Sequence, residues 1–421
     1  MNFARFNHVL VPQSAHERLA WLTSRRGRFL RGGFHLYLSL TPLGRGLLLF
    51  WLFAGALGLN VSDTVCYVMW AVVTGVLAAS LAVRRYYPLR DVTIQAVAPN
   101  RVSVGAELEI EITLHSAWES YAHVQVEAPF LTWDGTYISE RQMVTALPRG
   151  QTVTHRATAR FSARGIHSLM PVFASRSVPW GVAAGPICQS EILDFVVVPT
   201  FPKIVNMQLP RAHRCQPRGV PMASSTGEAL ELGGVRPYQA GDRVRDLHAR
   251  TWARTGIPHV RQYQQEYFSR VGVVLDVNAI HVSEKQFEAA VSLCAGILAH
   301  VADKEALIDV MCIGNNVHSL TIGRSLGFLA QALDLLATVT PGDAFSLELI
   351  QPRLYAQMAS LSSVVMVCLS VDDSVLRIRE WLTQLNIPVR LLVVQPDMST
   401  VPAYGTLVTP AQIASGEELR L

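Results

Sequence analysis

The chain has few charged residues for its size and almost no lysine. Only 16% of its 421 residues are Asp, Glu, Lys or Arg, whereas 50% are hydrophobic, and the mean hydropathy is +0.26. Because a soluble protein of this length normally carries more charge, this composition predicts a membrane segment. The formal net charge is only +4, and lysine occurs only at Lys203, Lys285 and Lys304. Such a weak net charge, without aromatic residues interleaved among the basic ones, argues against a nucleic-acid-binding protein.

The sequence also lacks the common catalytic signatures. No Gly-rich phosphate loop follows a predicted strand, and His-Glu-x-x-His does not occur. The six cysteines include no Cys-x-x-Cys pair. Cys294, Cys312 and Cys368 fall within apolar helix or strand patterns, which is typical of reduced core residues in a reducing compartment. These absences favour a chain without catalytic residues.

Two apolar runs near the N-terminus account for the high hydropathy. They cover residues 46–59 and 65–83, and the second gives about 28 Å of helix at ~1.5 Å per residue, enough to cross a bilayer. Arginines such as Arg45 precede the first run, Arg84 and Arg85 follow the second, and none lies between them. By the positive-inside rule both flanks are cytoplasmic. We therefore predict a two-helix transmembrane hairpin over residues 43–83, after a basic cytoplasmic segment over residues 1–42, with membrane lipid as its surroundings.

The middle of the chain has the pattern of β-strands. Residues 91–202 contain short runs in which apolar and polar residues alternate, such as VTIQAV and LEIEITLH, separated by turn residues. Alternation with a period of two predicts an antiparallel β-sandwich of immunoglobulin-like size. His, Cys and acidic residues are not clustered along this region of the sequence, so we expect a spacer or docking module without a catalytic site.

The C-terminal part, residues 271–421, alternates between strand and helix patterns. Predicted strands cover residues 271–276, 306–313, 317–322, 364–370 and 389–394, and predicted helices cover 284–302, 325–339 and 374–385. This order predicts a doubly wound, mostly parallel α/β sheet, which binds ligands beyond the carboxyl ends of its strands.

Between these two regions, residues 203–270 are rich in arginine. The arginines around the Gly241–Asp242 turn, from residue 234 onward, are Arg236, Arg243, Arg245, Arg250, Arg254, Arg261 and Arg270. Guanidinium groups pair with carboxylates in fixed geometry, which predicts an ion-pair network in which Asp242 pairs with Arg245 or Arg254. The alternatives are a solvated basic face and a surface for an acidic partner or phosphate.

The order of residues in this segment resembles the signature of the bacterial "domain of unknown function 58" family. The matching positions are Arg236, Tyr238, Gly241, Asp242, Arg245, His248, Arg250, Ala253, Arg254, Arg261 and Glu266. The family's tryptophan after the histidine is replaced here by Ala249, and Trp252 stands three positions later. The resemblance extends to the Arg164-Gly165 step and to Pro179-Trp180-Gly181, where Val178 replaces the usual aspartate.

The resemblance implies that the C-terminal domain is like a von Willebrand factor A domain, which often binds magnesium at an Asp-x-Ser-x-Ser motif. The corresponding residues here are Asp276, Asn278 and Ile280. Isoleucine cannot coordinate a cation, so the expected site is degenerate, with either Thr340 and Asp343 or Asp372 and Asp373 as further oxygen donors. The alternative is that Asp276 is a strand-end carboxylate in a polar network, without a cofactor.

The resemblance also implies a function. Members of this family are membrane-tethered and are commonly encoded beside a MoxR-type AAA+ ATPase. We therefore expect a non-catalytic scaffold in the bacterial inner membrane, with both termini cytoplasmic, whose A-like domain docks such an ATPase or its client in cell-envelope-associated assembly. The alternative is a hydrolase that uses His248 within the arginine and carboxylate network. The oligomeric state stays open.

Overall fold

The computed structural model describes most of the chain. The described residues are 14–23, 28–57, 64–207, 231–242, 244–264, 270–279, 282–302, 307–313, 317–322, 327–342, 355, 361–396, 405–416 and 418–421. They form two compact units, one comprising residues 1–200 and 333–338 and the other residues 201–332 and 339–421.

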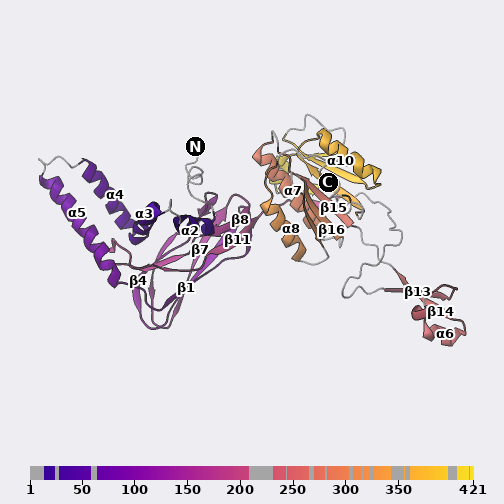
Figure 1. The fold of residues 1–421 in the computed structure, drawn as a ribbon, viewed down its shortest axis with the longest axis horizontal. Coiled ribbons are helices and arrows are strands. Elements are labelled where there is room, and N and C mark those ends of the chain that lie inside the picture. Colours follow the sequence, from indigo (N-terminus) through magenta and orange to yellow (C-terminus); the bar gives the residue numbers. More distant parts are fainter. Residues whose placement is uncertain are drawn as a thin grey trace. The chain divides into compact units, whose positions relative to one another are not determined.

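The first unit begins with four helices, α2 (Ala15–Thr23), α3 (Arg28–Ser39), α4 (Pro42–Leu57) and α5 (Thr64–Val83). Proline at the first position of α4 and the Thr41 hydroxyl, which accepts a hydrogen bond from the Gly44 N–H at 3.1 Å, fix the start of this helix. Helices α4 and α5 lie side by side (Figure 1). They are joined by Trp51, which stacks on Trp70 with ring centroids 5.4 Å apart and donates from Nε1 to Thr74 Oγ1 at 2.7 Å.

One described helix, Tyr67–Tyr86, is long and apolar enough to cross a membrane, and the apolar part of α4, Pro42–Gly55, is shorter. Only 11% of the most apolar window of the longer helix is buried. Large apolar side chains on both helices are exposed, including Leu49, Phe53 and Val72. A core helix of a soluble domain would bury such side chains, so this surface is suited to an apolar environment.

The β-rich part of the first unit confirms strands across the region predicted to contain them. The strands are β1 (Val92–Val97), β2 (Arg101–Ser103), β3 (Glu107–Ser116), β4 (Tyr121–Glu127), β5 (Gly135–Tyr137), β6 (Gln142–Leu147), β7 (Thr152–Phe161), β8 (Gly165–Leu169), β9 (Phe173–Arg176), β10 (Cys188–Gln189) and β11 (Leu193–Val198). They form sheets of order β1-β3-β7-β5, β10-β9-β4-β6 and β2-β11-β8.

Strand β3 shows why the alternating pattern produces this core. Leu108, Ile110 and Ile112 are fully buried, whereas the intervening Glu109 and Glu111 are exposed. Successive side chains of a strand point to opposite faces, so one face enters the core and the other meets water.

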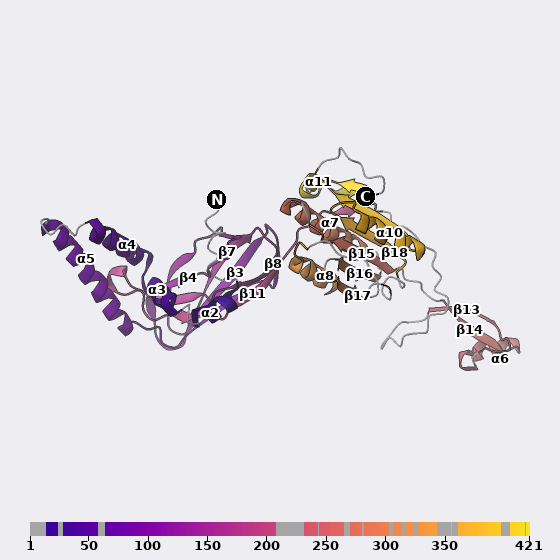
Figure 2. The same cartoon turned by 45° about the horizontal axis from the view of Figure 1, so that its top comes forward.

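The second unit contains a six-stranded sheet of order β17-β16-β15-β18-β19-β20 (Figure 2). The strands are β15 (Arg270–Asp276), β16 (Leu307–Ile313), β17 (Val317–Ile322), β18 (Ser363–Cys368), β19 (Val389–Val394) and β20 (Thr406–Val408). All neighbouring pairs are parallel except β16 with β17. This confirms the predicted α/β region with a mostly parallel sheet.

The helices of this region are α7 (Glu284–Ala302), α8 (Gly327–Thr338), α10 (Asp373–Gln384) and α11 (Pro410–Ala414). The α10 residues Val375, Ile378 and Leu382 pack on one face of the sheet around Val274 and Met366. Strands β15 and β18 each lead through a helix to their outer neighbour, in opposite directions across the sheet. Right-handed crossovers therefore place α7 and α10 on opposite faces.

Helix α7 is buried along most of its length because it also packs against β12 (Ile204–Val205) and α11. The cysteines predicted to be core residues, Cys294, Cys312 and Cys368, are free and buried. Burial raises the pKa of the Cys294 and Cys368 thiols, so both stay protonated and unreactive at neutral pH.

The arginine-rich segment forms a small motif of its own. Strands β13 (Glu231–Pro237) and β14 (His259–Gln264) pair antiparallel, and between them lie a short 3-10 turn (Val244–Asp246) and helix α6 (Ala249–Thr255). Gly256, in the left-handed conformation with φ of 72°, ends α6 and donates to the Trp252 carbonyl. We call residues 231–264 the signature hairpin. Val260 is its one buried hydrophobic residue among those described, so the hairpin has little core of its own.

Candidate functional site

The six-stranded sheet creates a polar site where its strand order reverses. Strands β15 and β18 are neighbours, and the chain leaves them toward opposite edges of the sheet. Side chains that follow the carboxyl ends of two such strands meet in the crevice between their outgoing loops. Here these side chains are Asp276, the last residue of β15, Asn278, and Asp372 after β18. The sequence predicted that Asp276 and Asn278 belong to a site and named Asp372 as a further donor, and the structure brings the three together.

Asp276 is the buried centre of this cluster, with 1% of its surface exposed. Its Oδ1 accepts a hydrogen bond from the Asn278 N–H at 2.9 Å, while its Oδ2 is buried without a hydrogen-bond partner. Burial raises the pKa of Asp276 to about 7, and the nearby charge of Asp372 adds to this effect, against the smaller opposing effects of the Asn278 and Leu369 backbone N–H groups. Asp276 therefore exchanges a proton close to neutral pH.

Asp372 is held in place by helix α10. Its Oδ1 accepts from the Val375 N–H at 2.9 Å as the N-terminal cap of that helix, and its Oδ2 accepts from Asn278 Nδ2 at 3.3 Å. Close by, the buried amide of Gln286 donates to the carbonyls of Leu369 and Val394 at 2.9 and 2.7 Å. Gln286 thereby ties the carboxyl ends of β18 and β19 to α7, which makes this edge of the sheet rigid.

The described residues do not fit a magnesium ion well. Mg²⁺ requires oxygen ligands in a near-ideal octahedron, and the described part of the chain contains no group of three His, Cys, Asp or Glu residues that could hold a metal. The Asn278 side chain presents its N–H, not its carbonyl, to Asp372. The unpartnered Asp276 Oδ2 fits a proton, and Ile280 and Asp343 lie outside the described residues. The magnesium hypothesis for Asp276 and Asn278 stays a prediction.

The signature hairpin contains a well-formed ion pair, but not the predicted one. Arg236 donates from Nη1 and Nη2 to the two carboxylate oxygens of Asp242 at 2.7 and 2.6 Å. The Gln239 N–H donates to the same carboxylate at 2.8 Å. The expected pairing of Asp242 with Arg245 or Arg254 is wrong, because the turn at Gly241 (φ 107°) folds Asp242 back onto its own strand.

These contacts shift the ionisation of both partners. The hydrogen bonds from Arg236 lower the pKa of Asp242, and the bonds to Asp242 raise the pKa of Arg236. The pair is therefore charged throughout the physiological range, and it fixes the shape of the turn.

His248 has a structural role in the signature hairpin. Its Nδ1 accepts from the Thr251 N–H at 3.2 Å and lies 2.7 Å from Thr251 Oγ1, so the imidazole caps the start of α6. The backbone N–H of His248 donates to the His259 carbonyl at 2.7 Å, which joins the start of α6 to β14. These contacts hold the Nδ1 side of the imidazole, so His248 fixes the backbone of the hairpin.

The rest of the signature hairpin presents arginine and apolar side chains to solvent. Its exposed residues include Tyr238, Val244, Arg245, Arg250, Trp252, Arg254, Ile257 and Arg261. Trp252 is 44% exposed and Val244 71% exposed. Glu266, the last residue predicted for this site, lies outside the described residues. Arginine, tryptophan and tyrosine are the residues enriched at the energetic centres of protein interfaces.

A comparison with protein families identifies this part of the chain. Residues 234–339 match the family described as "Protein of unknown function DUF58". Residues 234–339 are a DUF58 region. The DUF58 match begins within β13 and ends just after α8, so it includes the signature hairpin together with Asp276 and Asn278. Asp372, the partner of Asn278, follows the matched region.

Other comparisons add little. A search of curated proteins returns no match. Among solved structures, similarity is found to the native conformation of E. coli alpha-2-macroglobulin, with 16% identity, a TM-score of 0.21, and coverage of 29% of this chain and 8% of that one. It is also found to a GH20 exo beta-N-acetylglucosaminidase from Vibrio harveyi, with 7% identity, a TM-score of 0.17, and coverage of 73% and 57%. This chain thus spans less than two thirds of either solved chain, and neither similarity supports an argument about fold or function.

Outside the DUF58 match, the structure reveals a polar cluster in the β-rich region. Thr132 Oγ1 donates to Asp134 Oδ1 at 2.5 Å and lies 3.3 Å from His167 Nδ1, and His167 Nε2 lies 3.5 Å from Asp134 Oδ2. All three residues are buried beneath a cavity of about 410 Å³ that Arg164 also lines. Burial lowers the pKa of His167, against the opposing effect of Asp134.

The sequence does not reveal this cluster, because these residues are not clustered along the chain. Asp134 and His167 are far apart in the sequence and become neighbours only through the pairing of strands. The one local signal was His167 itself, a polar residue in an apolar strand.

Proposed function

We propose that this protein is a membrane-anchored, non-catalytic scaffold. In this proposal the α/β domain, of von Willebrand factor A-like type, docks a MoxR-type AAA+ ATPase or its client in an assembly at the bacterial inner membrane. The immunoglobulin-like β-sandwich serves as a spacer between the membrane and that domain.

The membrane part of the proposal is supported by the surfaces of α4 and α5. Both helices expose large apolar side chains such as Leu49, Phe53 and Val72, whereas arginines stand at the base of the pair, with Arg45 in the first turn of α4 and Arg84 after α5. This distribution suits a hairpin with both ends on the cytoplasmic side. The shorter α4 can be accommodated if the bilayer thins locally or the helix tilts less than its neighbour.

The observation that carries the docking proposal is the exposed surface of the signature hairpin. A motif with little core of its own presents Tyr238, Trp252 and four arginines to solvent, while its one strong ion pair and its histidine are used to hold the backbone. Arginine, tyrosine and tryptophan together suit an acidic, partly apolar partner surface. The A-like assignment of the sheet is supported by its strand order and by Asp276 and Asp372 at its reversal point.

Co-purification tests the docking proposal. The full chain, solubilised in detergent, is expected to retain a MoxR-type ATPase from the same organism, with affinity measured in the presence and absence of nucleotide. Trp252→Ala should weaken binding about 30-fold, the effect of losing an interface contact worth about 2 kcal/mol. Arg254→Glu should weaken it further at low salt, because it reverses one charge of the surface.

Arg149→Glu, an exposed arginine in the β-rich region, makes the same charge change away from the hairpin and should leave binding unchanged. No retention of the ATPase under any nucleotide condition, or equal weakening by Arg149→Glu and Arg254→Glu, would refute docking through the hairpin.

A further inference from the structure

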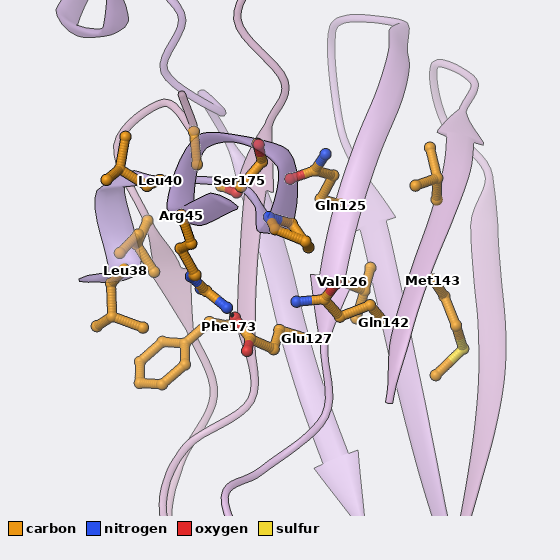
Figure 3. Close-up of a pocket in the computed structure, with 15 residues that line it drawn as sticks. Leu38, Leu40, Arg45, Gln125, Val126, Glu127, Gln142, Met143, Phe173 and Ser175 are labelled. Carbon is orange, nitrogen blue, oxygen red and sulfur yellow. Dashed lines mark hydrogen bonds and ion pairs between the residues drawn. The ribbon is translucent and has the colours of Figure 1, made fainter. Parts of the chain in front are cut away.

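A second cavity lies where the apolar helices meet the β-rich region. It has a volume of about 160 Å³ and is lined by the end of α3, the start of α4 and the sheet β10-β9-β4-β6. Figure 3 shows Leu38 and Leu40 on one side, Gln142 and Met143 on the other, and Arg45 reaching from α4 to Glu127. All of these residues belong to the first unit.

The register of the sheet explains how the floor of this cavity forms. On β4, Glu127 pairs with Phe173 of β9 and Gln142 of β6, which makes one row of neighbouring side chains across three strands. The preceding Val126 is fully buried. Because successive side chains point to opposite faces, Glu127 and its row lie on the face away from the core. The floor therefore combines polar groups with the apolar surface of Phe173.

The roof of the cavity is rigid. Leu40 forms a β-bridge with Ala183, and the Thr41 N–H donates to the Val182 carbonyl at 3.1 Å. Gly44, one turn into α4, approaches the same carbonyl so closely that an added Cβ would lie 1.9 Å from the oxygen. The helix is thus held directly against the backbone beside the sheet, and the cavity is formed before any ligand arrives.

The charged side chains beside the cavity include more positive than negative groups. Arg45 Nη2 lies 3.4 Å from Glu127 Oε2, and Arg141 Nη2 lies 3.0 Å from Glu127 Oε1. The side chain of Arg45 is 19% exposed, that of Arg141 is 30% exposed and that of Glu127 is 14% exposed. Two guanidinium groups thus share one carboxylate, which leaves one positive charge uncompensated in a largely desolvated place.

Two hydrogen-bond donors of Arg141 have no aligned acceptor. Its guanidinium stacks 3.8 Å above the Phe130 ring. Its Nε and Nη2 are buried without an aligned hydrogen-bond acceptor, since the short contact of Nη2 with Glu127 does not have hydrogen-bond geometry. Buried donors normally find an acceptor, and a buried charge normally finds a counter-charge. Arg141 itself does not line the cavity, whereas Arg45 does, so an anionic group beside Arg45 would supply the counter-charge that the two guanidinium groups lack.

We propose that this cavity binds the phosphodiester and neighbouring carbon atoms of an anionic membrane phospholipid. The phosphate group interacts with the guanidinium group of Arg45, which lines the cavity, while the charge of Arg141 behind Glu127 adds to the attraction, and the adjoining carbons lie along Leu38 and Phe173. A cavity of about 150 Å³ holds a molecule the size of benzene, so only this part of the lipid enters. The acyl chains remain in the bilayer beside α4. The proposal rests on the proposed anchoring of α4 and α5 in the membrane.

The test uses the full chain in a neutral detergent. We expect phosphatidylglycerol at 100 times its Kd to raise the Tm by roughly 5–10 °C, and phosphatidylcholine, whose headgroup has no net charge, to raise it far less. Glycerol phosphate serves as the soluble source of the same phosphate chemistry and should produce no shift at equal concentration. Native mass spectrometry should detect about one retained anionic lipid per chain.

Two matched variants locate the site. Gln142→Trp fills the cavity from the edge strand β6 and should abolish both the Tm shift and the retained lipid. Gln95→Trp makes the same change at an exposed position of β1 and should preserve both. Both variants should have the wild-type Tm without lipid. If that Tm falls for Gln142→Trp, Val144→Trp replaces it, because Val144 is exposed, lines the cavity and lies on the same face of β6 as Gln142.

Equal shifts in the two variants, or a full shift with glycerol phosphate alone, would overturn the lipid site. Sedimentation of the wild-type chain with membranes reports on anchoring separately. A chain that sediments with membranes but shows no lipid-specific shift refutes the cavity proposal and leaves anchoring intact.

Discussion

The β-rich region and the α/β sheet each bury a carboxyl group, but they surround it with opposite chemistry. Asp134 lies beside the imidazole of His167 and the hydroxyl of Thr132. Asp276 lies near a second carboxyl group, Asp372, and keeps one oxygen without a hydrogen-bond partner. We therefore expect the stability of the two regions to change with pH in opposite directions. The neighbours of a buried carboxyl group, and not its burial alone, determine how the site responds to pH.

Asp309 adds a third case within the same α/β sheet. It is almost fully buried in β16 and receives two hydrogen bonds from Arg270 at the start of β15, at 2.5 and 3.1 Å. This Arg–Asp pair has the same chemistry as Arg236–Asp242 in the signature hairpin, but the hairpin pair is more exposed. Comparing the two pairs therefore shows how burial changes the contribution of an Arg–Asp pair to stability, because both pairs have similar geometry.

The largest effect should come from removing one partner of the buried pair. Asp309→Ala leaves the charge of Arg270 without its partner and should lower the free energy of unfolding of the α/β sheet by about 3–5 kcal/mol. Asp242→Ala, the matched change in the exposed pair, should have a much smaller effect on global stability. Urea unfolding followed by hydrogen exchange in β15 and β16 measures both variants. Equal losses would show that burial does not distinguish the two pairs.

The next largest effect concerns Asp276 and pH. Its pKa of about 7 in the folded chain lies above the ordinary unfolded value of about 3.9. The unfolded chain therefore releases this proton first, so the contribution to stability is complete below about pH 4 and is lost as the pH rises to about 7. A difference of about three pKa units corresponds to about 4 kcal/mol as an upper value.

Asp276→Asn keeps an acceptor for the Asn278 N–H but does not ionise. It should remove this pH dependence and stabilise the α/β sheet at pH 8, as measured by hydrogen exchange in β15 and β18. A wild-type sheet whose stability does not change between pH 4 and pH 8 would contradict a raised pKa.

The effect of Mg²⁺ on stability tests whether Asp276 prefers a proton or a metal ion. If the site prefers a proton to a metal, millimolar Mg²⁺ at pH 8 should leave the stability of both wild type and Asp276→Asn unchanged. A Tm that rises with Mg²⁺ in the wild type alone would instead support the degenerate metal site at Asp276 and Asn278, because only a carboxylate ligand would be lost in the variant.

The elements that sequence patterns predicted well are those governed by local spacing. Helix α7 spans residues 284–302 as predicted, because one stripe of apolar residues recurs at helical spacing, and β15 begins within one residue of its expected start. Asp276 and Asp372 could be anticipated together because strand order determines which strand ends are neighbours. The Arg236–Asp242 pair and the Asp134–His167 cluster could not, because each depends on a turn or on strand pairings between distant residues.

The smallest effect is expected in the β-rich region on acidification. Burial places the pKa of His167 below its ordinary value, so the unfolded chain binds a proton more readily than the folded one. Stability is therefore complete above the unfolded pKa of about 6.5 and falls as the pH drops below it. Hydrogen exchange in β8 should quicken between pH 7 and pH 5, after correction for intrinsic rates, while exchange in β15 slows. His167→Gln, which cannot be protonated, should abolish the change in β8 alone. If β8 instead becomes more protected at pH 5, the charge of Asp134 outweighs burial, and the contrast between the two buried carboxyl groups disappears.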